Sequence, residues 1–188
     1  MKQCKLNLFP ECPGYCPSGA DFSQDKQYRY HLWRAWGTDH HKSIMFIGLN
    51  PSTANEKTDD PTIRRLVSFA KGWGFNSIHM YNLFALVSAY TEALFTNPKP
   101  ISENQGTEGE MCMNDRNIIF GFETNNPIVF CWGSWKIPNL KDRVNTITAE
   151  LKTDYWKHKN VMCFGKNKDG QPKHPLYLKS DTSLVPFF

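Results

Sequence analysis

The sequence of 188 residues lacks long apolar runs. Its longest apolar segments, such as residues 43–49, are far shorter than the roughly 20 residues that a membrane-spanning helix requires. The first residues also lack an extended apolar stretch and a small-residue cleavage site, so we expect no signal peptide. We therefore expect a cytoplasmic protein that has no membrane partner.

A strong excess of charge of one sign is also missing. The chain contains 22 Lys and Arg residues against 18 Asp and Glu residues, which gives a net charge of +4 at pH 7. This mildly basic balance permits nucleic-acid binding but does not predict it alone. Apolar residues make up 40% of the chain, which excludes a wholly disordered protein, and the length fits one domain. We expect a monomer.

No Cys-x-x-Cys pair occurs among the six cysteines. Cys4, Cys12 and Cys16 cluster near the N-terminus, and the last two flank a Pro-Gly-Tyr turn that can form half of a zinc or iron–sulfur site. Three clustered cysteines are an incomplete ligand set, so we predict no metal and no other cofactor. Cys131 and Cys163 lie inside apolar segments and are predicted to be buried thiols.

Four short apolar segments predict buried strands. They cover residues 43–49, 77–81, 127–132 and 160–164. Apolar residues at helical spacing between them predict helices that begin at Pro61, near Asn114 and near Lys141. Strands that alternate with helices are typical of a parallel sheet with helices on both faces. The predicted fold class is therefore α/β, a three-layer α/β/α sandwich around a central, mainly parallel four-stranded sheet.

The chain is predicted to divide into an extension and a domain. We assign residues 41–188 to the α/β domain. Residues 1–40 are predicted to form an irregular N-terminal extension that packs on the domain, because turn residues dominate its first part. Residues 28–36 within this extension are rich in aromatic side chains and fit either an edge strand or a short helix.

Ligands of open parallel sheets bind at the carboxyl ends of the strands. The segments that follow the predicted strands are therefore the first candidates for a functional site. They are residues 48–52, 82–85, 132–134 and 174–178, with the sequences Gly-Leu-Asn-Pro-Ser, Asn-Leu-Phe-Ala, Trp-Gly-Ser and His-Pro-Leu-Tyr-Leu.

In this order the four segments resemble the motifs of the uracil-DNA glycosylase superfamily. The first resembles the Gly-[Ile/Met]-Asn-Pro-Gly loop of the mismatch-specific and single-strand-selective branches. The second resembles the strand end whose Asn reads the base edge, and the others resemble the motifs Val-Phe-x-Leu-Trp-Gly-Ser and His-Pro-Ser-Pro-Leu. The resemblance covers Ser43 to about Leu178 and implies a uracil-DNA glycosylase-like fold.

The sequence resembles an uncharacterised bacterial and phage domain family still more closely. The pattern of that family is Leu-Asn-Pro-Ser-Thr-Ala, Asp-Asp-Pro-Thr-Ile-Arg-Arg, Asn-Leu-Phe-Ala, Trp-Gly and His-Pro-Leu-Tyr. All five motifs occur in this chain. This second resemblance does not indicate which activity the protein has.

The glycosylase resemblance implies two catalytic residues, Asn50 and His174. Cleavage of an N-glycosidic bond requires water at the sugar and stabilisation of the charge that develops on the departing base, which is first flipped out of the duplex. The Asn50 amide can orient water but cannot ionise, so it is a weaker general base than the Asp of the uracil-specific branch. His174 can donate a hydrogen bond to the base oxygen. The alternatives are an Asn-Pro turn and a solvated loop histidine.

Further residues are expected to bind the substrate. The Asn82 amide suits the amide edge of a pyrimidine, and Phe84 can stack on a flipped base. Leu176 and Tyr177 occupy the place where the superfamily inserts a wedge into the duplex. The structural alternatives are a strand-end cap, core packing and loop packing. The predicted substrate-binding residues are Gly48, Leu49, Pro51, Ser52, Asn82, Leu83, Phe84, Trp132, Gly133, Ser134, Pro175, Leu176 and Tyr177.

Charged residues near these segments allow two interpretations. Asp59, Asp60 and Arg64 begin the first helix, either as a cap and a solvated face or as a secondary part of the site. In the second interpretation an Asp assists catalysis, and Arg64 or Arg65 contacts a phosphate. Lysines near His174 form either a basic rim for a nucleic-acid backbone or an ordinary surface loop. These lysines are Lys166, Lys168, Lys173 and Lys179.

These expectations together favour a DNA glycosylase-like hydrolase that binds an altered or modified base in DNA and excises it. An alternative is a non-catalytic protein that binds nucleic acid or a nucleotide in the same pocket. A third candidate is a phage or defence factor that acts on a hypermodified base or a free nucleotide. The expected partner is DNA, or a nucleotide or base ligand.

Overall fold

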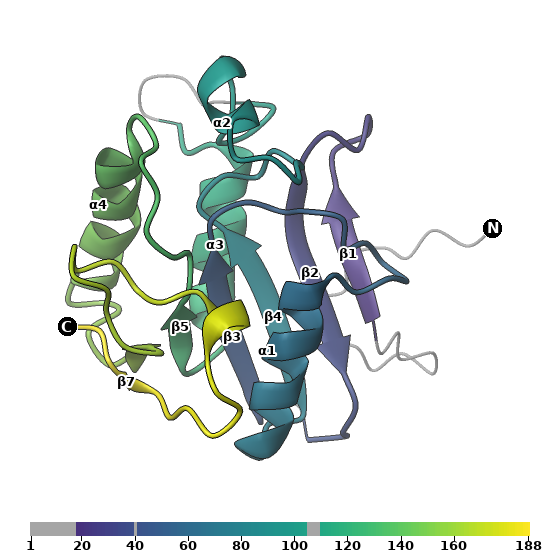
Figure 1. The fold of residues 1–188 in the computed structure, drawn as a ribbon, viewed down its shortest axis with the longest axis vertical. Helices are drawn as coiled ribbons and strands as arrows, with labels where there is room; N and C mark the ends of the chain where they lie inside the picture. The colour runs from purple at the N-terminus through teal and green to yellow at the C-terminus, as the bar shows by residue number, and fades with distance from the viewer. Residues whose placement is uncertain (1–17, 40, 105–109) are drawn as a thin grey trace.

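Within residues 18–39, 41–104 and 110–188, which the computed structural model describes, seven strands form one mixed sheet (Figure 1). The strands are β1 (Ser18–Phe22), β2 (Arg29–Ala35), β3 (Ser43–Gly48), β4 (Ser77–Asn82), β5 (Ile128–Phe130), β6 (Val161–Cys163) and β7 (Val185–Pro186). Their order across the sheet is β1-β2-β4-β3-β5-β6-β7.

The four strands that the sequence predicts occupy neighbouring places in this sheet. β3 pairs in parallel with β4 and with β5, and β5 pairs in parallel with β6. β1, β2 and β7 add antiparallel pairs at the two sides. The α/β class is therefore confirmed, whereas the expected four-stranded sheet is too narrow. The seven-stranded sheet is mixed because the chain enters and leaves it through antiparallel strands.

The N-terminal strands correct the prediction for residues 1–40. Residues 18–35 contain β1 and β2 instead of an irregular extension, and β2 lies between β1 and β4, so it is not an edge strand. Tyr30, Leu32 and Arg34 of β2 are buried and alternate with partly exposed residues. This period of two is that of a strand, but an arginine at a buried position hides the apolar alternation. Residues 1–17, with the predicted cysteine cluster, lie outside the described residues.

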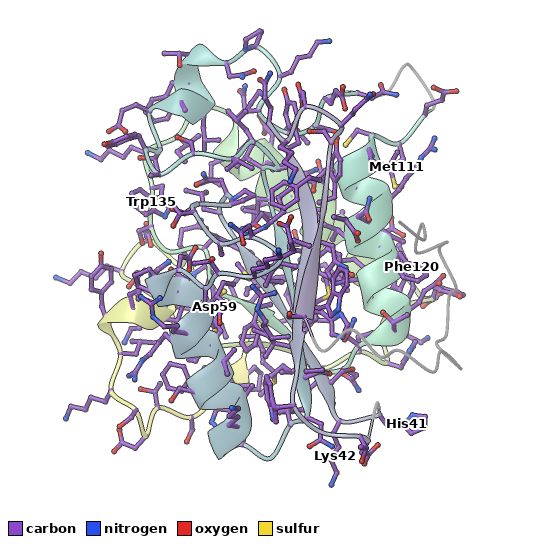
Figure 2. All side chains as sticks on the ribbon, turned by 90° about the vertical axis from the view of Figure 1, so that its right-hand side faces the viewer. His41, Lys42, Asp59, Met111, Phe120 and Trp135 are labelled. Atoms are coloured by element: carbon purple, nitrogen blue, oxygen red, sulfur yellow. The ribbon has the colours of Figure 1, made fainter. Side chains whose placement is uncertain are left out.

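Helices cover both faces of the sheet. They are α1 (Pro61–Gly72), α2 (Ala93–Thr96), α3 (Met113–Thr124), α4 (Leu140–Leu151) and the 3-10 helix η1 (Pro175–Tyr177). Ile44 and Phe46 of β3 pack in the core beneath α1, and Met45 and Ile47 pack in the core beneath α3 and α4. Figure 2 shows α1 and α3 on opposite sides of the sheet. Side chains of a strand alternate between its faces, so the all-apolar β3 supplies both cores.

The start of α1 follows from its sequence. Asp60 is the N-cap, and its Oδ1 accepts a hydrogen bond of 2.8 Å from the backbone N of Ile63. Pro61 occupies the first turn, where its missing N–H costs nothing. This start places the Asp60 carboxylate close to the carboxyl ends of the parallel strands, where the candidate site lies.

Two further predictions concern cysteines and membrane spans. Cys131 and Cys163 are buried, as their apolar surroundings predict. Burial alone raises the pKa of the Cys131 thiol far above its ordinary value, so this thiol stays protonated. Among the described residues, no helix is long and apolar enough to cross a bilayer.

Candidate functional site

The loops after β3 and β4 run side by side at the carboxyl edge of the sheet. Gly48 and Asn82 are register partners, and the parallel pairing continues beyond the strands. The backbone N of Leu83 donates to the Gly48 carbonyl at 2.9 Å, and the N of Phe84 donates to the Leu49 carbonyl at 2.9 Å. Leu49, Leu83 and Phe84 are buried in the core, which supports packing for Phe84 and leaves it no exposed ring face for stacking.

The Asn50 amide is tied to the loop that follows β4. Its Nδ2 donates to the carbonyls of Pro51 at 3.0 Å and Ser88 at 2.9 Å, with a longer contact of 3.5 Å to the carbonyl of Leu86. These acceptors fix which side of the amide carries the NH2 group. Within the described residues Oδ1 has no hydrogen-bond partner, so it is free to accept a hydrogen bond from water.

Arg29 of β2 holds the Asn82 amide by a hydrogen bond. Asn82 is only 1% exposed, and its Oδ1 accepts a hydrogen bond of 3.1 Å from Nη2 of Arg29. Arg29 also donates from Nη1 to the Ala54 carbonyl at 3.0 Å. The Nδ2 of Asn82 is buried and has no hydrogen-bond partner among the described residues. A buried donor without a partner is energetically costly, and pairing of this atom with an acceptor would remove that cost.

Arg29 is a residue of this site that the sequence prediction missed. It is 2% exposed, and burial lowers its pKa to about 10, while the Asp60 carboxylate acts in the opposite direction. The guanidinium therefore stays charged at neutral pH. The signal in the sequence is a pair of arginines, Arg29 and Arg34, within a short aromatic segment, where charged residues are unexpected.

His174 is the N-cap of η1 and lies against the loop that follows β5. Its Nδ1 accepts a long hydrogen bond of 3.4 Å from the backbone N of Leu176. Burial lowers the pKa of His174 and the charge of Asp60 opposes this shift, so the ring is neutral at pH 7. With Nδ1 as acceptor, the neutral ring carries its proton on Nε2, which can donate to a ligand.

The loop after β5 packs against His174 through Gly133. Gly133 has a φ of +80°, and a Cβ at this position would lie 3.3 Å from the Cβ of His174. Trp132 is buried, and its Nε1 donates to Oε1 of Gln171 at 2.7 Å, which is a packing role. Ser134 points away and is exposed. Its hydroxyl donates to Asp169 at 2.9 Å, so the structure does not bring Ser134 to Asn82.

Helix η1 presents the predicted wedge residues at the surface. Leu176 is 39% exposed and Tyr177 is 85% exposed, whereas Pro175 is buried. The carbonyl of Leu178 accepts a hydrogen bond from Nη2 of Arg65 in α1, which anchors η1 to that helix. Arg65 thus has a structural contact here, and Leu176 and Tyr177 are accessible at the surface.

The acidic residues before α1 separate into two roles. Asp59 accepts a hydrogen bond of 2.7 Å from Nε of Arg34, and its backbone carbonyl accepts one from Arg64. These contacts hold the helix start and leave Asp59 and Arg64 outside the site. Asp60 is buried and acts electrostatically on both Arg29 and His174. Of the three charged candidates, Asp60 is the one that the structure brings to the site.

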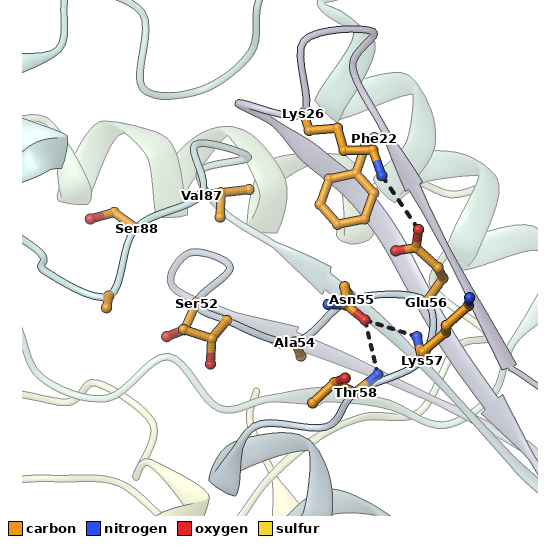
Figure 3. A pocket seen from close by; sticks show the side chains of 12 residues that line it. Phe22, Lys26, Ser52, Ala54, Asn55, Glu56, Lys57, Thr58, Val87 and Ser88 are labelled. Atoms are coloured by element: carbon orange, nitrogen blue, oxygen red, sulfur yellow. Dashed lines mark hydrogen bonds and ion pairs between the residues drawn. The ribbon is translucent and has the colours of Figure 1, made fainter.

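A surface hollow of about 650 Å³ lies beside the site (Figure 3). The loop of residues 52–58 and residues 87–89 form two of its sides, and Phe22 and Lys26 form a third. Ser52 is the predicted substrate-binding residue in this lining, whereas Asn82 and His174 do not belong to it. The hollow therefore does not enclose the Asn82 amide.

Comparison with known proteins places the chain in a family. Residues 29–176 match the family described as "Protein of unknown function (DUF1643)". Because the match spans most of the 188 residues, from the start of β2 into η1, the chain belongs to this family. No curated protein and no solved structure matches the chain.

Proposed function

We propose that this chain is a DNA glycosylase-like protein that binds an altered base and hydrolyses its N-glycosidic bond. The observation that carries the proposal is the buried Asn82 amide, whose Nδ2 lacks a partner at the carboxyl edge of the sheet. A flipped base supplies the acceptor that this donor lacks. The parallel pairing of β3, β4, β5 and β6 supports the glycosylase-like fold that the sequence resemblance implies.

Asn50 and His174 have complementary roles in this proposal. The Oδ1 of Asn50 orients a water molecule, whose oxygen forms a bond to the sugar carbon. The electrons of the breaking C–N bond leave with the base, and Nε2–H of His174 stabilises the negative charge that develops there. The departing base takes up the proton that the water loses. The buried Asp60 carboxylate favours the positive charge that develops on the sugar.

The exposed part of the site contacts DNA in this proposal. Tyr177 and Leu176 fill the space that the flipped base leaves in the duplex, because an exposed apolar tip suits unstacked base pairs. Lys166 and Lys168 are exposed on the loop before η1 and face the phosphate backbone.

A second candidate function is binding without turnover, and one observation favours it. Asn50 cannot ionise, and its NH2 group is committed to backbone carbonyls that hold two loops together. A protein that only binds a base needs no activated water, so this structural role of Asn50 suffices for it. The contacts proposed between the base and Asn82 or His174 are the same for hydrolysis and for binding without turnover.

Mass spectrometry of released bases tests the proposal. Purified protein is incubated with DNA pools that contain deaminated, oxidised, alkylated or hypermodified bases, and the free bases are measured. Release of a base by the wild-type chain, and its loss in His174→Ala, supports hydrolysis. Tight binding of such DNA without release supports the binding module. Absence of both binding and release would contradict the proposed function.

A further inference from the structure

We propose that a second surface hollow, lined by Trp135, binds one unpaired nucleotide of a nucleic-acid strand, with the base stacked on the indole ring. This hollow, called the Trp135 hollow below, has a volume of about 410 Å³. Residues 135–138, 140 and 141 form one side of it, and Asp169 and Gln171 form the other. The inference rests on the proposed function for its partner, a nucleic-acid strand, but it does not depend on base release.

Trp135 offers a fixed and accessible aromatic surface. Its Nε1 donates a hydrogen bond of 2.5 Å to the carbonyl of Trp132, so the one polar atom of the indole already has a partner. Trp135 is nevertheless 42% exposed, which leaves apolar ring surface in contact with water. A base can cover this surface by stacking, and every base has a flat face that suits an aromatic ring.

Side-chain hydrogen bonds join the loop after β5 to the loop after β6, which supply the two sides of the hollow. The Nε1 of Trp132 donates to Oε1 of Gln171 at 2.7 Å, and the Ser134 hydroxyl donates to Asp169 at 2.9 Å. The Nδ2 of Asn167 donates to the Ser134 hydroxyl at 2.8 Å. Because the protein makes these bonds itself, a ligand that enters the hollow has little ordering to impose on the two loops.

Gln171 and Asp169 supply hydrogen-bonding groups of opposite type. An indole N–H is a donor only, so the Gln171 amide turns its oxygen to Trp132 and keeps its NH2 group for other partners. Within the described residues, the Nε2 of Gln171 has no hydrogen-bond partner. The Oδ1 of Asp169 accepts from the Ser134 hydroxyl and from the backbone N of Gln171 at 3.1 Å. The edge of a base carries both acceptors and donors, so it can pair with both residues.

Lys136 and Lys141 supply positive charge on the other side of the hollow. Both side chains are exposed, and neither forms an ion pair in the part of the chain that the structure describes. Asp169 is the one carboxylate among the described lining residues, so positive charge is in excess. A ligand that is only apolar has no use for two free cations, whereas a nucleotide combines an aromatic base with a phosphate.

The Trp135 hollow is continuous with the surface that is proposed to contact DNA. A Cβ at Gly133 would lie 3.1 Å from Nε1 of Trp135 and 3.3 Å from the Cβ of His174, so a single glycine separates the two side chains. The ring centroid of His174 lies 5.9 Å from that of the exposed Tyr177. A strand that contacts His174 can therefore continue to Trp135, and this favours a nucleotide within a strand over a free nucleotide.

The test compares two single strands of equal length, oligothymidine and a strand built only of abasic tetrahydrofuran units. Fluorescence anisotropy at constant salt gives their affinities for the wild type, Trp135→Leu and Trp135→Phe. Both variants lose the Nε1 hydrogen bond, but only Trp135→Leu loses the aromatic ring. Tyr155→Leu is the matched control, because Tyr155 is 68% exposed but lies between α4 and β6. The readout is the ratio of the affinity for oligothymidine to that for the abasic strand, which a decrease in the amount of folded protein does not change.

We expect Trp135→Leu to lower this ratio by about fivefold or more, the lower end of the range for one base stacked on an aromatic ring. Trp135→Phe and Tyr155→Leu should keep most of the wild-type ratio. An unchanged ratio in Trp135→Leu, or an equal decrease in Trp135→Phe, would overturn the inference and leave the proposed base release intact.

The two lysines are tested together. Joint replacement of Lys136 and Lys141 by Ala should weaken the binding of both strands by the same factor, because phosphates are present in both. The ratio of the two affinities should stay the same. Unchanged affinity for both strands would contradict the phosphate contact in the hollow.

Photo-crosslinking of the wild type keeps the inference testable should Trp135→Leu not fold. An oligothymidine in which 5-iodouracil replaces one thymine is irradiated with the protein, and mass spectrometry identifies the crosslinked residue. A crosslink at Trp135 supports the inference, and crosslinks at other residues alone overturn it.

Two other outcomes separate the inference from its alternatives. Thymidine monophosphate that competes as strongly as oligothymidine would assign the hollow to a free nucleotide and overturn the strand as its occupant. Absence of base release from every DNA, together with the expected decrease in Trp135→Leu, would overturn hydrolysis and support the Trp135 hollow.

Discussion

The two halves of the carboxyl edge hold their side chains in different ways. After β3 and β4, the amides of Asn50 and Asn82 are fixed by hydrogen bonds to backbone carbonyls and to a buried arginine. After β5 and β6, Ser134 and Tyr177 are exposed. His174 lies between these halves, partly buried, with one ring nitrogen held by its own loop.

This difference suggests separate roles for the loops after β3 and β4 and the loops after β5 and β6. Fixed amides suit the recognition of a base, because groups that are already oriented lose little freedom when the ligand binds. Exposed side chains suit a duplex or single strand, whose contacts form only when the nucleic acid arrives. If this division is correct, substitutions in the first half should change base choice or chemistry, and those in the second half should change general affinity for DNA.

The largest expected effect is on base release. Asn50→Ala and His174→Ala should each slow release by roughly 100-fold or more, the scale of losing one oxyanion donor, because both groups act in the transition state. The affinity for uncleaved substrate should change little. Single-turnover kinetics and equilibrium binding on the same oligonucleotide measure both quantities.

An exposed histidine provides the control for this experiment. His158 lies between α4 and β6, away from the site, so His158→Ala should release the base at the wild-type rate. If His174→Ala also releases the base at that rate, the role given to His174 is wrong. If His174→Ala instead lowers substrate affinity by the same factor as the rate of base release, His174 contacts the substrate in the ground state. It would then be grouped with the residues that bind the base.

The next effect concerns binding and compares one residue from each half. Asn82→Ala should weaken affinity for the target base by roughly 5- to 150-fold, which corresponds to about 1–3 kcal/mol for an unpaired base edge. Ser134→Ala should change it by less than about twofold, since its hydroxyl is exposed and bonded to Asp169. Isothermal titration with a non-cleavable substrate checks both, and equal decreases in affinity would remove the distinction between the halves.

Two glycines with the same positive φ, Gly133 and Gly170, test the contact between Gly133 and His174. Gly133 and Gly170 both have a φ of +80°, but only Gly133 lies against His174. Gly133→Ala and Gly170→Ala should each lower the free energy of unfolding by about 1–2 kcal/mol, the cost of a left-handed non-glycine residue. Urea denaturation measures this decrease. Base release should fall in Gly133→Ala alone, and a similar fall in Gly170→Ala would show that the contact with His174 is unimportant.

The fold was predictable where one residue pattern determined one element. The apolar run of β3 and the Asp60-Pro61 start of α1 agree with the structure because strand burial and helix capping act locally. β1 and β2 were not predictable with the same rules, because Arg29 and Arg34 occupy buried positions of β2. Their burial depends on partners far away in the sequence, which a local pattern does not contain.

The same physical limit applies to the site. Asn50 and Asn82 follow the neighbouring parallel strands β3 and β4, and this topology alone brings their loops to one edge of the sheet. Arg29 comes from an antiparallel strand that enters the sheet from outside the predicted four, and its contact with Asn82 spans 53 positions. The outward turn of Ser134 also depends on a distant partner, Asp169.

The smallest expected effect concerns the exposed half and its lysines. If Lys166, Lys168 and Lys173 follow a phosphate backbone, their joint replacement by Ala should make the logarithm of DNA affinity less steeply dependent on the logarithm of salt concentration. The slope should fall by about 0.9 for each phosphate that the variant no longer neutralises, because every neutralised phosphate releases counterions. Selectivity between bases should stay the same.

A matched triple variant removes charge elsewhere and isolates this effect. Lys42, Lys152 and Lys157 are exposed and lie before β3 or between α4 and β6, away from the carboxyl edge. Their replacement by Ala changes the net charge by the same amount and should leave the salt slope almost unchanged, because screening limits distant charges. Equal slopes for the two triple variants would mean that only net charge attracts DNA. A change in base selectivity in the first variant would mean that the basic loop also helps to orient the base, so that the two halves of the edge do not act separately.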